Sequence, residues 1–277
     1  MRKEEFISVL SGCAIRRGYD PSELQPNQVA QIVEYINDRV KEGWNKYAWP
    51  DAIKVEERLF RPELIPTVAY EIGDEVFFRG KYLVCIGSRG AGNSVWDLQP
   101  VLDRYVAYQQ EGHTEIVDVL GVYCSNPRTT RVPERLKYSL SDNGVQVSLD
   151  SPDKVWIEFT TQAPQFTSNY WSSTTDYTVG NVVFDEAWKN LNGTGECYKC
   201  ISPNKNQQPN ERSPFWKLIP FPKVLATFVR RAVDADMLRE DEQFAKADAA
   251  ERIANEKLEQ EILNLTYKQN QYCRFVP

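Results

Sequence analysis

The 277-residue sequence predicts an α+β fold: a helical bundle of N-terminal helices plus a long C-terminal helix, a β-rich middle, and two small repeated β-modules. Hydrophobic spacing supports this prediction, because apolar residues recur at helical spacing near both ends and alternate with polar residues in the middle. A short sequence pattern that occurs twice predicts the two repeated β-modules. The expected segments are an N-terminal helical segment at 1–66, a first module at 67–102, a β-rich segment at 103–168, a second module at 169–220 and a C-terminal helical segment at 221–277.

The first expected element is an amphipathic helix that begins near Pro26 and ends near Tyr47. It ends there because Pro50 follows, and the residue before a proline avoids helical backbone angles. A short second helix is expected from Pro50 to Leu59. The apolar side chains of the first helix share one side at helical spacing: Val29, Ile32, Val33, Ile36, Val40 and Trp44.

The repeated pattern runs from Tyr70 to Ile86 as "YEIGDEVFFRGKYLVCI" and returns as "YTVGNVVF" at 177–184 and "CYKCI" at 197–201. In both copies a tyrosine is followed by a glycine three residues later, then by a valine three further on and an aromatic residue. The second copy carries insertions in its turns and loops, as a repeated folding unit would. Each copy later has Cys-Ile and closes with Trp-x-Leu-x-Pro, at Trp96, Leu98 and Pro100 and at Trp216, Leu218 and Pro220.

The β-rich segment between the two copies contains runs in which apolar and polar residues alternate. In one run Val155, Ile157 and Phe159 occupy every second position, which predicts a strand buried on one face. An Asp-Asn-Gly sequence at 142–144 predicts a hairpin turn.

The C-terminal segment is expected to be helical from Phe221 to about Gln269, with a break near Arg239 to Glu242. Residues 234–261 contain ten acidic and four basic side chains, a net charge of −6 that equals the net charge of the whole chain. These charges fit either a solvated face with ion pairs between successive turns or a face that meets a basic partner. The expected apolar stripe comprises Leu225, Phe228, Val229, Ala232 and Val233, followed by Ala245, Ala249, Ile253, Leu258, Ile262 and Leu265.

The overall charge argues against two classes of function. A pI near 5.1 and a net charge of −6 disfavour broad binding to nucleic acids or anionic membranes, because both need clustered positive charge. The sequence has no apolar run of membrane-spanning length and no secretory leader at its start, so we expect a protein made and folded in a cytoplasm.

Residue types that build metal sites are sparse. The six cysteines include one CxxC pair, Cys197 and Cys200, and the only histidine is His113. Structural zinc needs four ligands, so we expect no metal, no cofactor and buried reduced thiols. A Ser-His-Asp or Cys-His centre would have to use His113, and the neighbours of His113 in the sequence form no nucleophile elbow or other catalytic motif.

A carboxylate pair is the remaining candidate for catalysis. Glu71 and Asp74 are close in the first module, but Thr178 and Asn181 stand at the matching places of the second. The features that the two copies share are therefore aromatic and apolar rather than acidic. We expect no enzyme, and no catalytic residue is assigned.

The module pattern resembles small chitin-binding-type carbohydrate-binding modules, in which a tyrosine, Gly-Asp, a valine, Tyr-x-Cys and a closing tryptophan follow in order. The first copy matches at Tyr70, Gly73, Asp74, Val76, Tyr82, Cys85 and Trp96, with two residues instead of one between Tyr82 and Cys85. The second matches at Tyr177, Gly180, Val183, Cys200 and Trp216, with Asn181 in place of the aspartate. The resemblance implies two roles for the aromatic residues, either stacking on a sugar face or filling the module core. The candidates are Tyr70, Tyr82, Trp96, Tyr177 and Trp216.

The order of segments across most of the chain resembles the head-to-tail adaptor (neck, or connector) proteins of tailed bacteriophages. The phrases that carry the resemblance are "WNKYAWPDAIKVEERLF", "VWIEFTTQAPQFT", the two hairpin modules and the terminal helix beginning "FVRRAVDADMLREDEQFAKADAAERIANEKLEQEILNL". It implies a virion structural protein at the head–tail interface, a homo-oligomeric and dodecameric ring that docks on the portal protein. Such a ring extends the DNA channel and connects to the tail or to other neck proteins.

The same resemblance gives the acidic helix a role. Glu251, Glu256 and Glu259 would line the channel, where DNA passes without specific binding, or would contact the portal. No membrane partner is expected. The alternative function, from a different class, is a carbohydrate-binding protein with two chitin-binding-like modules on a helical stem.

Overall fold

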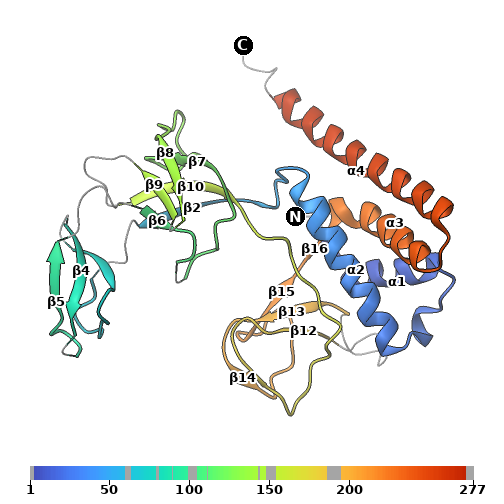
Figure 1. Cartoon of the computed structure of the whole chain (residues 1–277), viewed down its shortest axis with the longest axis horizontal. Coiled ribbons are helices and arrows are strands. Elements are labelled where there is room, and N and C mark those ends of the chain that lie inside the picture. The colour runs from blue at the N-terminus through green and yellow to red at the C-terminus, as the bar shows by residue number, and fades with distance from the viewer. Residues whose placement is uncertain are drawn as a thin grey trace. The chain divides into compact units, whose positions relative to one another are not determined.

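The computed structural model describes residues 3–59, 64–78, 81–88, 90–98, 105–110, 112–142, 144–147, 154–185 and 195–272. The chain forms two compact units (Figure 1), which we call unit 1 (residues 1–49 and 163–277) and unit 2 (residues 50–162). Helices lie in unit 1 and small antiparallel sheets occur in both units, so the fold is mixed α+β. The names first module and second module are kept for segments 67–102 and 169–220.

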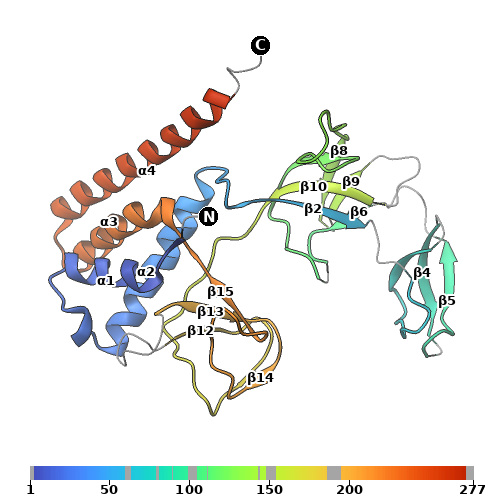
Figure 2. The same ribbon diagram turned by 180° about the vertical axis from the view of Figure 1, so that it is seen from behind.

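Unit 1 contains four α-helices among its described residues, and α3 contacts each of the other three (Figures 1 and 2). All six apolar residues predicted for one side of α2 are buried, which confirms that helix. A capping box between Gln25 and Gln28 starts it, with Pro26 in the first turn. Sequence periodicity did not reveal α1. The helices are α1 (Phe6–Arg16), the short 3₁₀ helix η1 (Pro21–Glu23), α2 (Pro26–Asn45), α3 (Lys223–Glu240) and α4 (Phe244–Tyr272).

The predicted break in the C-terminal helix is confirmed between α3 and α4. Glu242 adopts a positive φ of 59°, and the Gln243 N–H donates to the Leu238 carbonyl at 2.9 Å, as in a helix C-terminus. This break resets the phase of the following helix. Ala245 and Ala249 are therefore exposed, contrary to the predicted stripe, and the buried positions of α4 are Ala247, Ala254 and Leu258.

Beside the helices, the described part of unit 1 holds two small sheets from the second module and a two-stranded sheet, β1-β16, whose residues lie outside that module. Phe6 of α1 joins the two parts, because its ring stacks on Phe166 at 4.6 Å and meets Phe184 edge-on at 5.7 Å. The strands are β1 (Lys3–Glu4) paired with β16 (Phe221–Pro222), β11 (Asp176–Tyr177) paired with β14 (Asn204–Lys205), and the sheet β12-β13-β15 formed by Val182–Phe184, Cys197–Cys200 and Trp216–Ile219.

Unit 2 has three sheets of three strands each among its described residues. Val155, Ile157 and Phe159 are fully buried, which confirms the predicted one-sided strand. Strands β8 and β9 pair as a hairpin with Ser141 opposite Gly144, as predicted, and Asn143 of the predicted turn lies outside the described residues. The sheets are β2-β10-β7 (Ile53–Leu59, Lys154–Thr160, Asp118–Tyr123), β6-β9-β8 (Tyr105–Ala107, Gly144–Val147, Tyr138–Ser141) and, from the first module, β3-β4-β5 (Glu75–Phe78, Lys81–Gly87, Val95–Leu98).

The predicted helix from Pro50 to Leu59 is wrong, because residues 53–59 form strand β2. This strand pairs with β10 along its whole length, from Ile53 opposite Thr160 to Leu59 opposite Lys154. Pairing with a strand a hundred residues away overrides a local pattern that is compatible with either structure.

Candidate functional site

Each module contains one tyrosine and one tryptophan that pack edge to face. The ring centroids of Tyr70 and Trp96 are 5.1 Å apart with an interplanar angle of 72°, and those of Tyr177 and Trp216 are 5.1 Å apart at 71°. Each pair is thus placed for the edge-to-face attraction that aromatic rings favour. Four of the five residues that the sequence selects as sugar-stacking or core candidates therefore meet in pairs, one pair in each module.

Both tyrosine hydroxyls are also tied to the backbone five residues earlier. Ile65 N–H donates to Tyr70 Oη at 2.8 Å, and Ser172 N–H donates to Tyr177 Oη at 2.7 Å. A hydroxyl that accepts a backbone hydrogen bond holds a local turn in place. The ring of each tyrosine thus packs on a tryptophan, and its hydroxyl binds the backbone.

The turn after each tyrosine has the same geometry. Gly73 has φ 101° and Gly180 has φ 98°, values that glycine adopts without strain. Asp74 Oδ2 accepts from the Glu71 N–H at 2.7 Å, and Asn181 Oδ1 accepts from the Thr178 N–H at 2.8 Å. The asparagine keeps the bond that the aspartate makes, because an amide oxygen accepts it equally well.

The turn is fastened to the next strand by a reciprocal pair of hydrogen bonds. In the first module Gly73 N–H donates to Cys85 O at 2.8 Å, and Cys85 N–H donates to Asp74 O at 2.7 Å. The corresponding distances in the second module are 2.9 Å for Gly180 to Cys200 and 2.7 Å for Cys200 to Asn181. Each cysteine lies opposite the tryptophan of its own module on the neighbouring strand.

The aromatic pairs differ in exposure. Tyr70 and Trp96 are half-buried, whereas Tyr177 is 7% exposed and Trp216 is 2% exposed. A pyranose ring cannot stack on a face that another side chain covers, so the second pair offers little platform. The backbone of Tyr82 belongs to β4, opposite Phe77, but its side chain lies outside the described residues.

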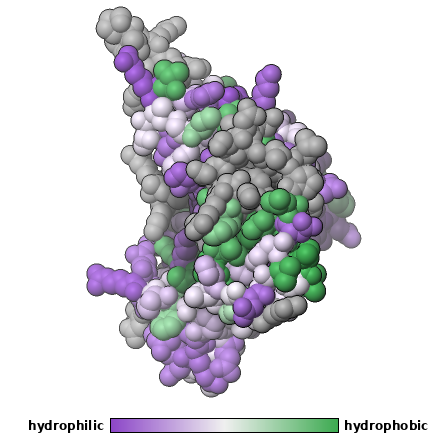
Figure 3. All heavy atoms as spheres, turned by 90° about the vertical axis from the view of Figure 1, so that its left-hand side faces the viewer, coloured by the Kyte–Doolittle hydropathy of each residue, from purple (hydrophilic) through white to green (hydrophobic). Residues whose placement is uncertain are grey.

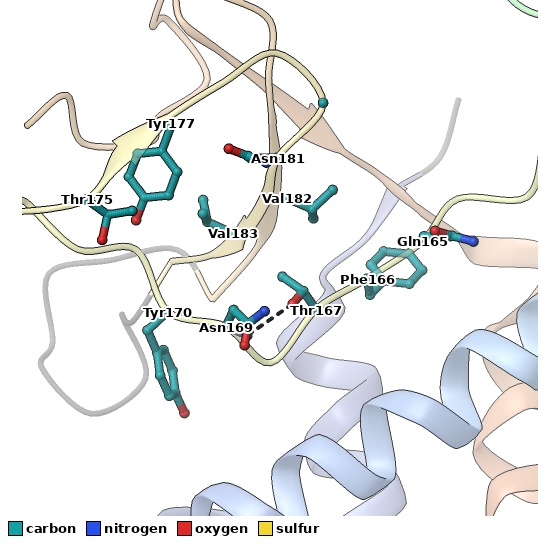
Figure 4. A pocket seen from close by; sticks show the side chains of 11 residues that line it. Gln165, Phe166, Thr167, Asn169, Tyr170, Thr175, Tyr177, Asn181, Val182 and Val183 are labelled. Atoms are coloured by element: carbon teal, nitrogen blue, oxygen red, sulfur yellow. Dashed lines mark hydrogen bonds between the residues drawn. The ribbon is translucent and has the colours of Figure 1, made fainter. Parts of the chain in front are cut away.

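An open pocket of about 660 Å³ lies in the second module (Figure 4). Its walls come from the extended segment before β11 and from the β11–β12 connection. None of its lining residues carries a charge, and Gln165, Asn169 and Asn181 supply amide groups. Tyr170 and Tyr177 add aromatic surface. The lining suits a neutral, hydroxyl-rich ligand. Among the lining residues the sequence selected only Tyr177 as a candidate sugar-stacking side chain, although the repeated pattern also includes Gly180, Asn181 and Val183.

The three glutamates selected on α4 do not share one environment. Glu251 lies on the buried stripe of α4. Arg39 of α2 donates a hydrogen bond to each of its carboxylate oxygens, at 2.7 Å (Nη2 to Oε2) and 2.9 Å (Nη1 to Oε1). Arg239 of α3 adds a contact of 3.1 Å. Glu256 and Glu259 are exposed, and they line a shallow hollow whose wall also includes Glu251. Only these two remain as outward acidic groups.

Arg39 is the centre of this helix junction. Its guanidinium also binds both oxygens of Asp236, at 2.7 Å from Nε and 2.5 Å from Nη2, and Glu42 at 2.7 Å. Burial by itself lowers the pKa of Arg39, but hydrogen bonds to Asp236 and Glu42 and the charges of Asp236 and Glu251 outweigh it and raise the pKa. The arrangement fastens α4 to α2 and α3.

A second polar cluster lies in unit 2. Arg58 is fully buried and donates from Nη2 to Glu56 Oε2 at 3.0 Å. Burial raises the pKa of Glu56, but hydrogen bonds from Thr114 and the charge of Arg58 outweigh it and hold the pKa below its usual value. His113 Nδ1 lies 3.6 Å from Glu56 Oε2. The cluster pairs charges within the sheet and contains no serine or cysteine nucleophile.

The CxxC cysteines do not face one another. Cys197 and Cys200 lie three residues apart on β13, so their side chains leave opposite faces of the strand. Burial raises the pKa of the Cys197 thiol to about 12. Four of the described cysteines are buried free thiols, as predicted, while Cys124 is exposed. Within the described ranges, no group of three or more His, Cys, Asp or Glu side chains is placed to hold a metal ion.

None of the described helices combines the length and the apolar character needed to cross a bilayer. Comparisons of the chain with protein-family models, with curated proteins and with solved structures find no match.

Proposed function

We propose that this protein is a non-enzymatic virion structural protein, a head-to-tail adaptor subunit that docks on the portal, extends the DNA channel and connects to the tail. The observation that carries the proposal is the use of the aromatic pairs. In each module the tyrosine and the tryptophan pack on each other, and the tyrosine hydroxyl accepts a backbone hydrogen bond. These side chains therefore have a structural role. The two modules are then copies of one folding unit that brace neighbouring subunits of the ring.

The helical part of unit 1 supports the same function. Because Arg39 fastens Glu251 to the neighbouring helices, the long helix α4 is held in place and presents Glu256 and Glu259 outward. Negative charge on a channel wall repels the DNA phosphates, so DNA passes without sticking. The same charges alternatively meet a basic surface of the portal. A closed ring needs two different faces on each subunit, and the helical and β parts supply them.

The test is to mix the purified chain with a candidate portal and to follow mass and shape by light scattering and negative-stain microscopy. We expect a closed ring on the portal. The double variant Glu256→Lys/Glu259→Lys should lose portal-dependent assembly or retard DNA release. The matched control is Glu23→Lys, an exposed glutamate of η1 that should leave both unchanged. A chain that never joins any portal, or a double variant that behaves like the control, contradicts the respective part of the proposal.

The neutral pocket of the second module favours one further candidate, a carbohydrate-binding protein. Amides and aromatic rings around an uncharged hollow are the groups that hydrogen-bond and stack on sugars. Titration calorimetry with chitin oligosaccharides tests this candidate. Binding that is weakened by Asn169→Ala and by Tyr170→Ala, but not by Ser173→Ala outside the pocket, would support it. The absence of heat with chitin and cell-wall oligosaccharides would exclude it.

A further inference from the structure

The two modules differ in charge at matching positions of their outer sheet faces. In the first module Val84 is the central residue, with Glu75 on one neighbouring strand and Asp97 on the other. In the second module the central residue is Lys199, with Val182 on one side and Lys217 on the other. We call the first set, together with Ile86, the acidic face, and the second set, together with Ile201, the basic face.

Strand geometry assigns these residues to the outer side of each sheet. Cys85 and Cys200 point into their module cores and are 1% and 0% exposed. Side chains alternate between the two faces of a strand, so Val84 and Lys199, which precede the cysteines, point outward. Ile86 lies at a register shift of β4 and Ile201 follows the last residue of β13, and both side chains are exposed. Directly opposed residues on neighbouring strands share a face. In each module the three paired residues therefore form one continuous outer surface across three strands.

The basic face contains an unfavourable pairing that a partner would relieve. Lys199 and Lys217 are exposed and lie directly opposite each other on β13 and β15. Like charges at directly opposed positions destabilise a sheet. Neither ammonium group has an ion-pair partner within the part of the chain that the structure describes. At the position that matches Lys217, the first module has Asp97, which is also exposed.

Both faces also expose an apolar side chain at the same place. Ile86 and Ile201 follow the core cysteines and are 52% and 47% exposed. On the side of the molecule shown in Figure 3, apolar side chains gather near the middle of the view, with polar side chains around them. A contact on such a surface depends on charge complementarity as well as on apolar burial.

We propose that the acidic face of one copy of this chain binds the basic face of a second copy. The two faces have the same register, opposite charge and an isoleucine at the same place, so the chain carries both halves of one contact. A contact between two different faces of identical subunits is heterologous, and it propagates from copy to copy until a ring closes. The biological role of this contact rests on the proposed function. The contact identifies the surfaces that join neighbouring subunits of the ring.

The test is sedimentation velocity of the full chain at low salt over a range of concentrations, with no other protein present. We expect the unaltered chain to associate as its concentration rises and to dissociate as salt screens the charges. Variant A, Glu75→Lys/Asp97→Lys, has two basic faces, and variant B, Lys199→Glu/Lys217→Glu, has two acidic faces. Each alone should associate about ten- to a hundredfold more weakly than the unaltered chain.

An equimolar mixture of variants A and B should restore association, because every basic face then finds an acidic one. This rescue also shows that both variants are folded. The matched control is Lys205→Glu, which reverses an exposed lysine on β14, outside the basic face, and should leave association unchanged.

Three results would overturn the contact: an unaltered chain that stays monomeric at its highest soluble concentration, variants that associate as well as the unaltered chain, or a mixture that fails to restore association. A portal-dependent ring that forms equally well from variant A would also overturn it, while leaving the adaptor proposal standing. Conversely, restored association without any portal-bound ring would support the contact and count against the adaptor proposal.

Discussion

The two modules share one set of core contacts but differ in what covers them. In both, the tyrosine–tryptophan pair, the glycine turn and the reciprocal turn-to-strand bonds agree within 0.1 Å in every paired distance given above. The aromatic pair is nevertheless half-buried in the first module and almost fully buried in the second. Contact geometry and burial are therefore set by different parts of the sequence.

The insertions of the second module account for the extra burial. Residues 202–215 include β14, which pairs with β11, and Gln207 O accepts a hydrogen bond from Trp216 Nε1 at 2.8 Å. Trp171 and Phe215 pack against the same core from outside the shared pattern. The first module has a shorter loop at the corresponding place, between β4 and β5, and the described residues of that loop are mostly exposed. A few shared residues set the geometry, and the added loops supply the cover.

The largest expected difference between the modules comes from removing the tryptophan. Trp216→Ala should cost about 3–5 kcal/mol of local stability because it leaves a cavity in a closed core. Trp96→Ala should cost about 1–2 kcal/mol, since part of that ring already contacts water. Hydrogen exchange of peptides from each module measures both values. Equal losses would show that the insertions do not stabilise the second core.

Substitution of the turn glycine should affect both modules equally. Gly73→Ala and Gly180→Ala should each cost about 1–2 kcal/mol, because their positive φ disfavours any Cβ. A Cβ at either position meets no atom within 4 Å, so steric contacts add nothing. Gly87→Ala is the control, since its new methyl would make only ordinary contacts of 3.5 Å with Val95. Urea midpoints compare the three variants, and a large inequality between the first two would break the equivalence of the turns.

Loss of the tyrosine hydroxyl should have a smaller and unequal effect. Tyr177→Phe should cost about 1 kcal/mol, because it removes the acceptor for the Ser172 N–H in a largely closed site. Tyr70→Phe should cost less, since Ile65 is exposed and its freed N–H can bind water. The change in urea midpoint gives both values. A larger effect in the first module would contradict the role assigned to the insertions.

The smallest effect is expected from exchanging the turn side chains. Asp74→Asn and Asn181→Asp should each change stability by less than about 0.5 kcal/mol, because both side chains accept the same backbone hydrogen bond. Thermal unfolding of the two variants and of the double exchange tests this expectation. A loss above about 1 kcal/mol in either would mean that the charge of the aspartate contributes to the first module.

Several features could be predicted because their signal repeats within a few residues. The buried side of α2, the break between α3 and α4, and the one-sided strand β10 follow from local periodicity and a local change in polarity. The matching aromatic, glycine and cysteine positions of the modules were visible for the same reason. A short spacing constrains the backbone whatever the rest of the chain does.

Other features depended on residues far away in the sequence. Residues 53–59 became a strand because β10 pairs with them, and Glu251 turned inward because Arg39 and Asp236 meet at the helix junction. The pocket needed two segments brought together by the sheet. No local pattern contains these partners.

The sequence by itself determined the α+β composition, the main helices and the matching residues of the two modules. Only the tertiary structure decided which aromatic pair is covered, which glutamates of α4 face outward, and how Lys199 and Lys217 come to lie side by side on one face. The physical reason is that helical and strand periodicity are properties of neighbouring residues. Burial and charge pairing are instead properties of whatever surface the folded chain brings opposite.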